Sequence, residues 1–340
     1  MKKVIVALSA LLVISCVNEP KDYVSISGNI IDQNSDSVVV RSRSYSKTIP
    51  VAADGTFSDT LKVETGIYNF YDGGESTSIF LKNGYDIKIS LDTKEFDESI
   101  AFSGNGAENS TFLAEYSLLR EEILDKPFDE MDKATFTKTF EEIETQLNDK
   151  ISNATGIDTL VTNHSAKEIT PMLNSYKGYF GGIIELKAEL NGKPAPTFEN
   201  FQNFDGSTTS LSDLKGKYVY VDVWATWCGP CKYEIPYLKE VEQKYHDKNI
   251  AFVSMSVDDE KRSGTMEKAE QDWKAMVADK ELKGIQIMSP NGWKNDFVTG
   301  FKINGIPRFI LIGPDGNTVD ASAPRPSDER LITLFNKHNI

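Results

Sequence analysis

Apolar and polar residues alternate through residues 23–105. In Val24-Ser25-Ile26-Ser27-Gly28-Asn29-Ile30 every second side chain is apolar, as a half-buried strand requires. Similar short runs follow at residues 38–40, 48–51, 57–63, 67–70, 78–81 and 87–91. Turn sequences such as Asp54-Gly55 and Asn83-Gly84 separate them. This spacing predicts a small β-sandwich-like domain.

The hydrophobic period becomes helical in residues 106–192. Apolar side chains recur at steps of three and four in three groups: 112–119, then Phe136, Phe140, Ile143, Leu147 and Ile151, then Met172 to Leu190. Stripes of this kind are usually core residues, so we assign no chemistry to this helical segment. Asn191-Gly192-Lys193-Pro194-Ala195-Pro196 is predicted to end it as a linker.

Strand and helix patterns alternate in residues 193–340. We expect strands at 197–204, 218–223, 250–257 and 285–288, and a closing hairpin at 309–312 and 317–320. Helical patterns cover 232–246, 264–280, 295–301 and 328–337. Such an order predicts an α/β domain, with a mixed sheet and helices on both faces.

Two cysteines stand at the junction between the strand 218–223 and the helix that follows. In Cys228-Gly229-Pro230-Cys231, Pro230 fits a first helical turn. A helix N-terminus favours a thiolate, so we expect Cys228 to be the more exposed and more acidic attacking group. Cys231, one turn further and more buried, would resolve the mixed disulfide. The pair can cycle between dithiol and disulfide without any other cofactor.

Two other uses of the cysteines remain open. A zinc site needs four ligands, and Cys16, His164, His246 and His338 show no ligand spacing, so we expect no metal. A purely structural disulfide is the stronger alternative.

Asp222 is the candidate base for Cys231. Strand alternation places it on the face opposite Val221 and Val223, beneath the helix that carries the cysteines. Burial would raise the pKa of its carboxyl group toward neutrality, where it can transfer protons. The alternative is a solvated acid at a strand edge.

The segment from Val221 to Lys232 resembles the active site of thioredoxin-fold proteins. Glu234, Pro236 and the later Gly305-Ile306-Pro307-Arg308 make residues 193–340 similar to the exported TlpA/ResA-like thiol–disulfide oxidoreductases. More loosely, residues 23–105 resemble an uncharacterised β-domain often fused in front of such domains. That domain would be a spacer or, alternatively, a docking module for a partner.

The resemblance implies roles for further residues. Glu234 would tune the thiols, unless it is a solvated first-turn glutamate. Pro307 would be a cis-proline facing the dithiol, unless it is only a turn proline, and it would leave the backbone of Ile306 free to pair with substrate. The remaining expected substrate-binding residues are Trp224, Trp227, Gly229 and Pro230, with the two tryptophans and Ile306 forming an apolar rim.

The N-terminus is read as a targeting segment. Lys2 and Lys3 precede a short apolar run, and Val13-Ile14-Ser15-Cys16 resembles a bacterial lipobox. We expect a signal peptide over 1–15, a lipid on Cys16 and a tether over 16–22. An ordinary signal peptide with a chance cysteine, or an uncleaved anchor, remains the alternative.

Together these patterns predict an exported, membrane-tethered thiol–disulfide oxidoreductase of the cell envelope. The net charge of −14 argues against nucleic acid as a partner. We expect it to reduce protein disulfides and to receive electrons from a membrane thiol transporter, as the resemblance implies. The alternatives are an oxidase or isomerase of the same fold, and a binding module whose dithiol is secondary.

Overall fold

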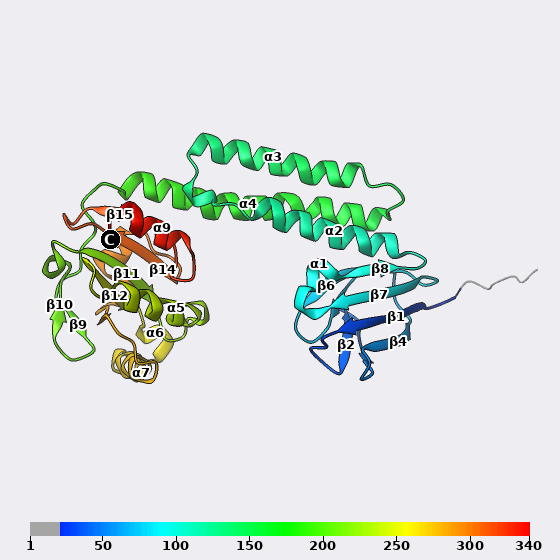
Figure 1. Ribbon diagram of the computed structural model, residues 1–340, viewed down its shortest axis with the longest axis horizontal. Helices are drawn as coiled ribbons and strands as arrows, with labels where there is room; N and C mark the ends of the chain where they lie inside the picture. The colour runs from blue at the N-terminus through cyan, green and yellow to red at the C-terminus, as the bar shows by residue number, and fades with distance from the viewer. Residues whose placement is uncertain (1–20) are drawn as a thin grey trace, which may run out of the picture. The chain divides into compact units, whose positions relative to one another are not determined.

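The computed structural model describes residues 21–340, which divide into two compact units. One unit contains residues 21–127 and 134–175, and the other contains 128–133 and 176–340 (Figure 1). The expected signal peptide, the expected lipidation site at Cys16 and residues 17–20 lie outside the described residues.

The first unit contains a sandwich of two four-stranded sheets. One sheet has the order β4 (Thr56–Leu61), β1 (Val24–Ile31), β7 (Asp86–Asp92) and β8 (Ala101–Ser103). The other has the order β3 (Ser46–Pro50), β2 (Ser37–Arg41), β5 (Gly66–Tyr71) and β6 (Ser76–Leu81). Alternate residues of both sheets, Ile26, Val40, Phe57, Phe70 and Ile89 among them, share one buried core. The alternating pattern therefore predicted this fold correctly, although the short strand β8 was not foreseen.

Three long helices follow the sandwich: α2 (Ala107–Leu124), α3 (Lys133–Ser152) and α4 (Thr159–Leu190). A short α1 (Phe96–Ser99) precedes them. Helix α2 packs on β6, where the backbone N–H of Phe80 donates to Ser110 Oγ at 3.0 Å. Helix α4 begins well before the expected Met172 and runs through Pro171. A proline removes one helical hydrogen bond, and burial of Ile169 and Leu173 on either side helps to hold the helix together.

The second unit is built on a seven-stranded mixed sheet. Its order is β10 (Thr208–Thr209), β9 (Phe201–Asn203), β13 (Ile285–Met288), β12 (Ile250–Ser256), β11 (Tyr218–Trp224), β14 (Arg308–Ile312) and β15 (Thr318–Asp320). Strands β11, β12 and β13 are parallel, whereas β14 is antiparallel to β11. The strand expected over 197–204 forms only at β9, because only its last residues pair with β13.

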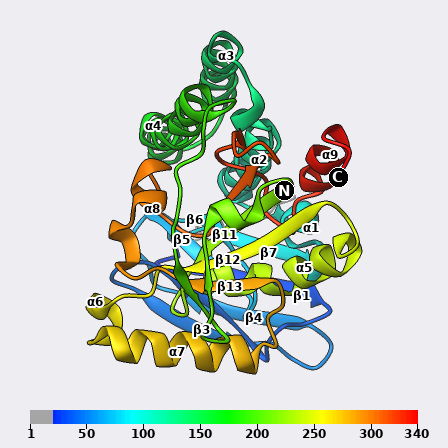
Figure 2. The same cartoon turned by 90° about the vertical axis from the view of Figure 1, so that its left-hand side faces the viewer.

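Side chains alternate between the two faces of this sheet. Tyr220, Phe309 and Leu311 pack with α5 (Gly229–Tyr245) and α9 (Arg330–Lys337). Val221 and Ile310 face α7 (Met266–Asp279), α8 (Asp296–Gly300) and the end of α4. Figure 2 shows α7 and α9 on different sides of the strands. The expected mixed sheet with helices on both faces is confirmed.

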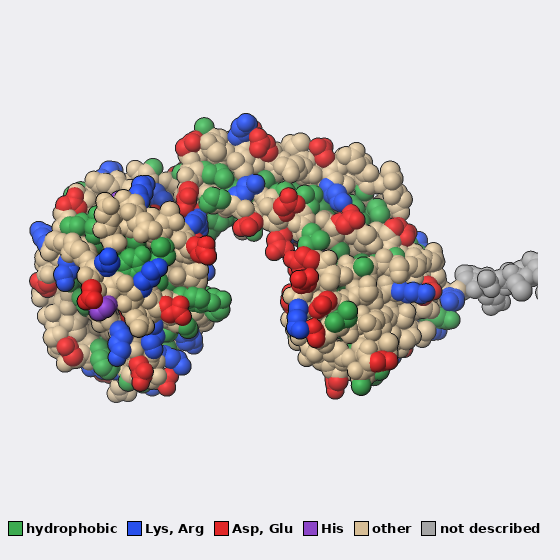
Figure 3. Space-filling model, in the orientation of Figure 1, with side chains coloured by type: hydrophobic (Ala, Val, Ile, Leu, Met, Phe, Trp, Pro, Cys, Tyr) green, Lys and Arg blue, Asp and Glu red, His purple; other side chains and the backbone are tan. Residues whose placement is uncertain are grey.

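The surface of each unit carries charges of both signs. Acidic and basic side chains are interspersed over the visible faces in Figure 3. Within residues 21–340, no helix combines the length and apolar composition needed to cross a bilayer.

Candidate functional site

Cys228 and Cys231 form a disulfide at the start of α5, with their Cα atoms 5.3 Å apart. Cys228 is the N-cap residue, and its Sγ accepts the backbone N–H of Cys231 at 3.1 Å. Pro230 occupies the first turn, where a missing N–H leaves no helical bond unmade. Beside the Cα atom of Gly229 there is open space. The helix N-terminus therefore directs its unpaired N–H groups and positive end at the sulfur atoms.

The two cysteines are equally buried. Each is 4 % exposed, so the expectation that Cys228 would be the more accessible one is wrong for this disulfide form. Both side chains belong to the apolar cluster that contains Val223 and Met255, and the bond holds the two sulfur atoms together in that cluster.

Asp222 lies in the middle of the sheet, on the face that α5 covers. It pairs with Ser254 of β12 on one side and with Phe309 of β14 on the other. Its side chain is buried, and Oδ1 has no hydrogen-bond partner among the described residues. A carboxylate without partners is costly in such a place, so the neutral form is favoured.

Two acids of α5 reinforce this effect. Burial is the largest cause, and together with the carboxyl groups of Glu242 and Glu234 it raises the pKa of Asp222 to about 8. Burial also raises the pKa of Glu242 to about 7, against a lowering by Lys239. Glu242 was not predicted, although its helical spacing from Leu238 places it on the buried stripe.

Glu234 is buried as well, and the alternative of a solvated first-turn glutamate is wrong. Its two carboxylate oxygens accept the backbone N–H of Ser327 at 3.0 Å and the Ser327 hydroxyl at 2.9 Å. Arg325 Nη1 lies 3.6 Å from the same carboxylate. Glu234 thus ties α5 to the segment before α9, a contact that spans 93 residues and that no local pattern announces.

The expected apolar rim is only partly at the surface. Trp224 is 2 % exposed, so it cannot offer a surface to substrate; it is the last residue of the central strand β11 and packs into the core. Trp227 is 38 % exposed. Its ring stacks on Trp293 at a centroid distance of 6.5 Å, and the Arg262 guanidinium lies 4.6 Å from its centroid. Trp293 and Arg262 were missed because both come from segments far along the chain.

A buried aspartate fixes the loop between β11 and the disulfide. Asp258 accepts the backbone N–H of Thr226 at 3.0 Å and its hydroxyl at 2.7 Å. Ser256 also donates to Asp258, at 2.8 Å. Burial raises the pKa of Asp258, while these hydrogen bonds lower it. Since β11 and β12 are parallel neighbours, an acid just after β12 could have been expected at this edge.

The loop before β14 contributes the remaining expected residues. The Ile306–Pro307 peptide bond is cis, and Ile306 packs against the cluster that contains both cysteines. Arg308 is the register partner of Val223, so this loop lies at the same end of the sheet as the disulfide.

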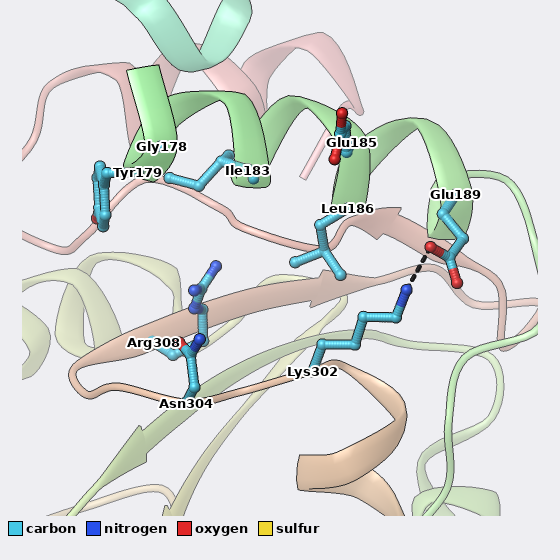
Figure 4. A pocket seen from close by; sticks show the side chains of 10 residues that line it. Gly178, Tyr179, Ile183, Glu185, Leu186, Glu189, Lys302, Asn304 and Arg308 are labelled. Atoms are coloured by element: carbon cyan, nitrogen blue, oxygen red, sulfur yellow. Dashed lines mark hydrogen bonds and ion pairs between the residues drawn. The ribbon is translucent and has the colours of Figure 1, made fainter. Parts of the chain in front are cut away.

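A cavity of about 360 Å³ lies beside Arg308. Figure 4 shows Arg308 directed toward α4, near Tyr179, while Lys302 pairs with Glu189. Arg308 Nη1 donates to Ser322 Oγ at 2.9 Å, and burial lowers the pKa of its guanidinium. Within residues 21–340, no group of three or more His, Cys, Asp or Glu side chains is placed to hold a metal ion.

Comparison with known proteins agrees with this geometry. The Redoxin family model matches residues 190–330. The thiol-disulfide oxidoreductase ResA of Bacillus thuringiensis subsp. konkukian is 31% identical over 162 residues, which cover 48% of this chain and 84% of that protein. The chain belongs to the ResA-like thiol-disulfide oxidoreductases.

Further relatives have the same character. ResA of Bacillus cereus is 29% identical, again over 48% of this chain and 84% of its own length. The crystal structure of the thioredoxin domain of a thiol-disulfide oxidoreductase from Bacteroides vulgatus is 28% identical, covers 44% of this chain and 96% of that chain, and superposes with a TM-score of 0.38. The ResA-like part of this chain is a thioredoxin-like thiol-disulfide oxidoreductase.

Proposed function

We propose that this ResA-like protein is an exported, membrane-tethered reductase of protein disulfides in the cell envelope. The observation that carries the proposal is the Cys228–Cys231 disulfide at the N-terminus of α5, together with the buried Asp222 carboxyl group on the α5 side of the sheet, whose Oδ1 has no hydrogen-bond partner among the described residues. A purely structural disulfide would not need Asp222 in that position, because an uncompensated buried acid destabilises the fold.

The reaction begins when the Cys228 thiolate attacks a substrate disulfide. One sulfur of the substrate leaves as a thiolate, and a mixed disulfide forms on Cys228. Asp222 then takes the proton of Cys231, whose thiolate attacks Cys228 Sγ. The second substrate sulfur leaves as a thiolate, and protons from solvent convert both substrate thiolates to thiols. The substrate has then gained two electrons, and the enzyme is left as the Cys228–Cys231 disulfide.

We infer the direction of the redox reaction and the location of the protein from the sequence. Gly229-Pro230 is the dipeptide of thioredoxin, whose potential is about −270 mV, whereas that of DsbA is about −120 mV. Return to the dithiol requires two electrons, which we assign to a membrane thiol transporter. The substrates would be envelope disulfides, apocytochrome c among them, and the tether would be a lipid on Cys16.

The decisive measurement is the reduction potential of the Cys228–Cys231 couple in glutathione buffers. A value near −270 mV supports the reductase, and a value near −120 mV would make the protein an oxidase or isomerase of the same fold. Cys231→Ala should trap substrates as mixed disulfides, while Cys228→Ser should trap none. Cys16→Ser should move the protein from the membrane to the soluble fraction.

A further inference from the structure

A second polar cavity lies in the first unit, on the helix-covered side of β6. It has a volume of about 320 Å³, and its wall combines residues of β5, β6, α1, α2 and α4. Its polar lining includes the side chains of Tyr116, Arg120, Ser165, Asp97 and Glu168. A cavity of this size is at the lower end of the range for small-molecule sites.

Three buried polar atoms without partners line this one cavity. They are Tyr116 Oη, Arg120 Nε and Ser165 Oγ, three of the eight such side-chain atoms in residues 21–340. Tyr116 is 4 % exposed and Ser165 is 2 % exposed. Buried polar groups are nearly always hydrogen-bonded, so three unpartnered atoms in one cavity indicate partners that come from outside the chain.

The three atoms can all donate a hydrogen bond. The Arg120 guanidinium is a donor only and is always charged, and it forms no ion pair with any described residue. Burial raises the pKa of Tyr116, which keeps its hydroxyl protonated at neutral pH; Arg120 lowers this pKa and Glu168 raises it. One cation and two hydroxyls make a site for the two oxygens of a carboxylate.

Two acids also line the cavity. Asp97 and Glu168 both line it, and two carboxylates beside one arginine disfavour a dianion such as phosphate. They suit an ammonium group instead. The edge strand β6 adds backbone groups to the cavity. The N–H of Phe80 points away from β5, toward Ser110. Because this direction alternates every two residues, the N–H groups of Ser76 and Ser78 also point away from β5.

We propose that this cavity binds a small zwitterion of the α-amino-acid class, either a free amino acid or a dipeptide. The carboxylate accepts hydrogen bonds from Tyr116, Arg120 and Ser165, and the ammonium group faces Asp97 and Glu168. The proposal concerns the first unit alone and does not depend on the redox function of the second.

The test is calorimetric titration of the full chain with single L-amino acids and with dipeptides. We expect at least one of these compounds to bind and to raise the Tm. Comparing the amino acids with the dipeptides shows which of the two classes is the ligand. The carboxamide and the N-acetyl derivative of the best ligand should each bind about tenfold more weakly or worse, because each removes one charged contact.

Variants tie the binding to this cavity. Tyr116→Phe and Ser165→Ala remove only a hydroxyl and should weaken binding about tenfold while leaving the unliganded Tm unchanged or raised. Tyr45→Phe and Ser152→Ala, in the same unit but outside the cavity, are the matched controls. The proposal is overturned if no probe binds, if phosphate binds as well as the zwitterions, or if the two cavity variants bind normally.

Discussion

Ser327 holds both carboxylate oxygens of Glu234, one through its backbone N–H at 3.0 Å and one through its hydroxyl at 2.9 Å. Glu234 stands one turn after Cys231 on α5, and Ser327 precedes α9. The carboxylate therefore positions the active-site helix against a segment that the chain reaches 93 residues later.

Removing either side of this contact should destabilise the protein. Glu234→Ala removes the buried acceptor of both Ser327 hydrogen bonds, so we expect a loss of about 1–3 kcal/mol in the free energy of unfolding. Ser327→Ala, which keeps the backbone N–H, should cost about 0.5–1.5 kcal/mol. Urea denaturation measures both. Equal stability of Glu234→Ala and the parent would contradict this assignment.

Asp222 makes stability depend on pH in a definite direction. Its folded pKa is about 8 and its ordinary value is 3.8, so between these limits the folded state binds more protons than the unfolded state. Stability is then lost as pH rises from about 4 to 8. Asp222→Asn removes this dependence. The free energy of unfolding of Asp222→Asn, relative to that of the parent, should therefore increase from pH 4 to pH 8 by several kcal/mol, on the order of 5 at most.

The same substitution should slow the release of mixed disulfides. Resolution by Cys231 should accelerate as Asp222 ionises toward pH 8, and this rise should disappear in Asp222→Asn. Glu242→Gln removes a neighbouring charge that raises the pKa of Asp222, so it should shift the rise to lower pH. Stopped-flow reduction of a disulfide peptide from pH 5 to 9 measures each profile; an unaltered profile in Asp222→Asn would remove this residue from the proton transfer.

Trp227 offers the exposed ring nearest to Cys228 in the chain. With Trp293 and Arg262 against it, it forms a platform for a substrate polypeptide, since aromatic surfaces bury much area on binding. Trp227→Ala should raise KM for a protein disulfide about tenfold or more with a small change in Tm. Tyr233→Ala, an exposed aromatic on α5, is the control and should leave KM unchanged.

Phe335 of α9 closes the core on the α5 side of the sheet. Its ring meets Tyr220 at a centroid distance of 5.7 Å and Tyr245 at 5.1 Å, and it is fully buried. Phe335→Ala should cost about 3–5 kcal/mol, because it leaves a cavity that rigid neighbours cannot fill. Calorimetric unfolding tests this, and a loss below 1 kcal/mol would show that α9 is not part of the cooperative core.

The sequence by itself determined the elements whose signal is local. Alternation at Val24–Ile31 and its successors identified the sandwich, because a half-buried strand must direct every second side chain inward. The strand, the two cysteines and Pro230 located the disulfide at a helix N-terminus within the fourteen residues 218–231. The parity of β11 alone placed Asp222 on the α5 side.

Only the tertiary structure decided which distant groups meet these residues. Ser327 meets Glu234, and Trp293 meets Trp227, through long-range packing that no short pattern encodes. Burial was also decided by the tertiary structure. Trp224 and Cys228 were both expected to be exposed, yet both pack into a buried cluster that includes residues of β12. The three unpartnered atoms of Tyr116, Arg120 and Ser165 come together only because α2, α4 and β6 line one cavity.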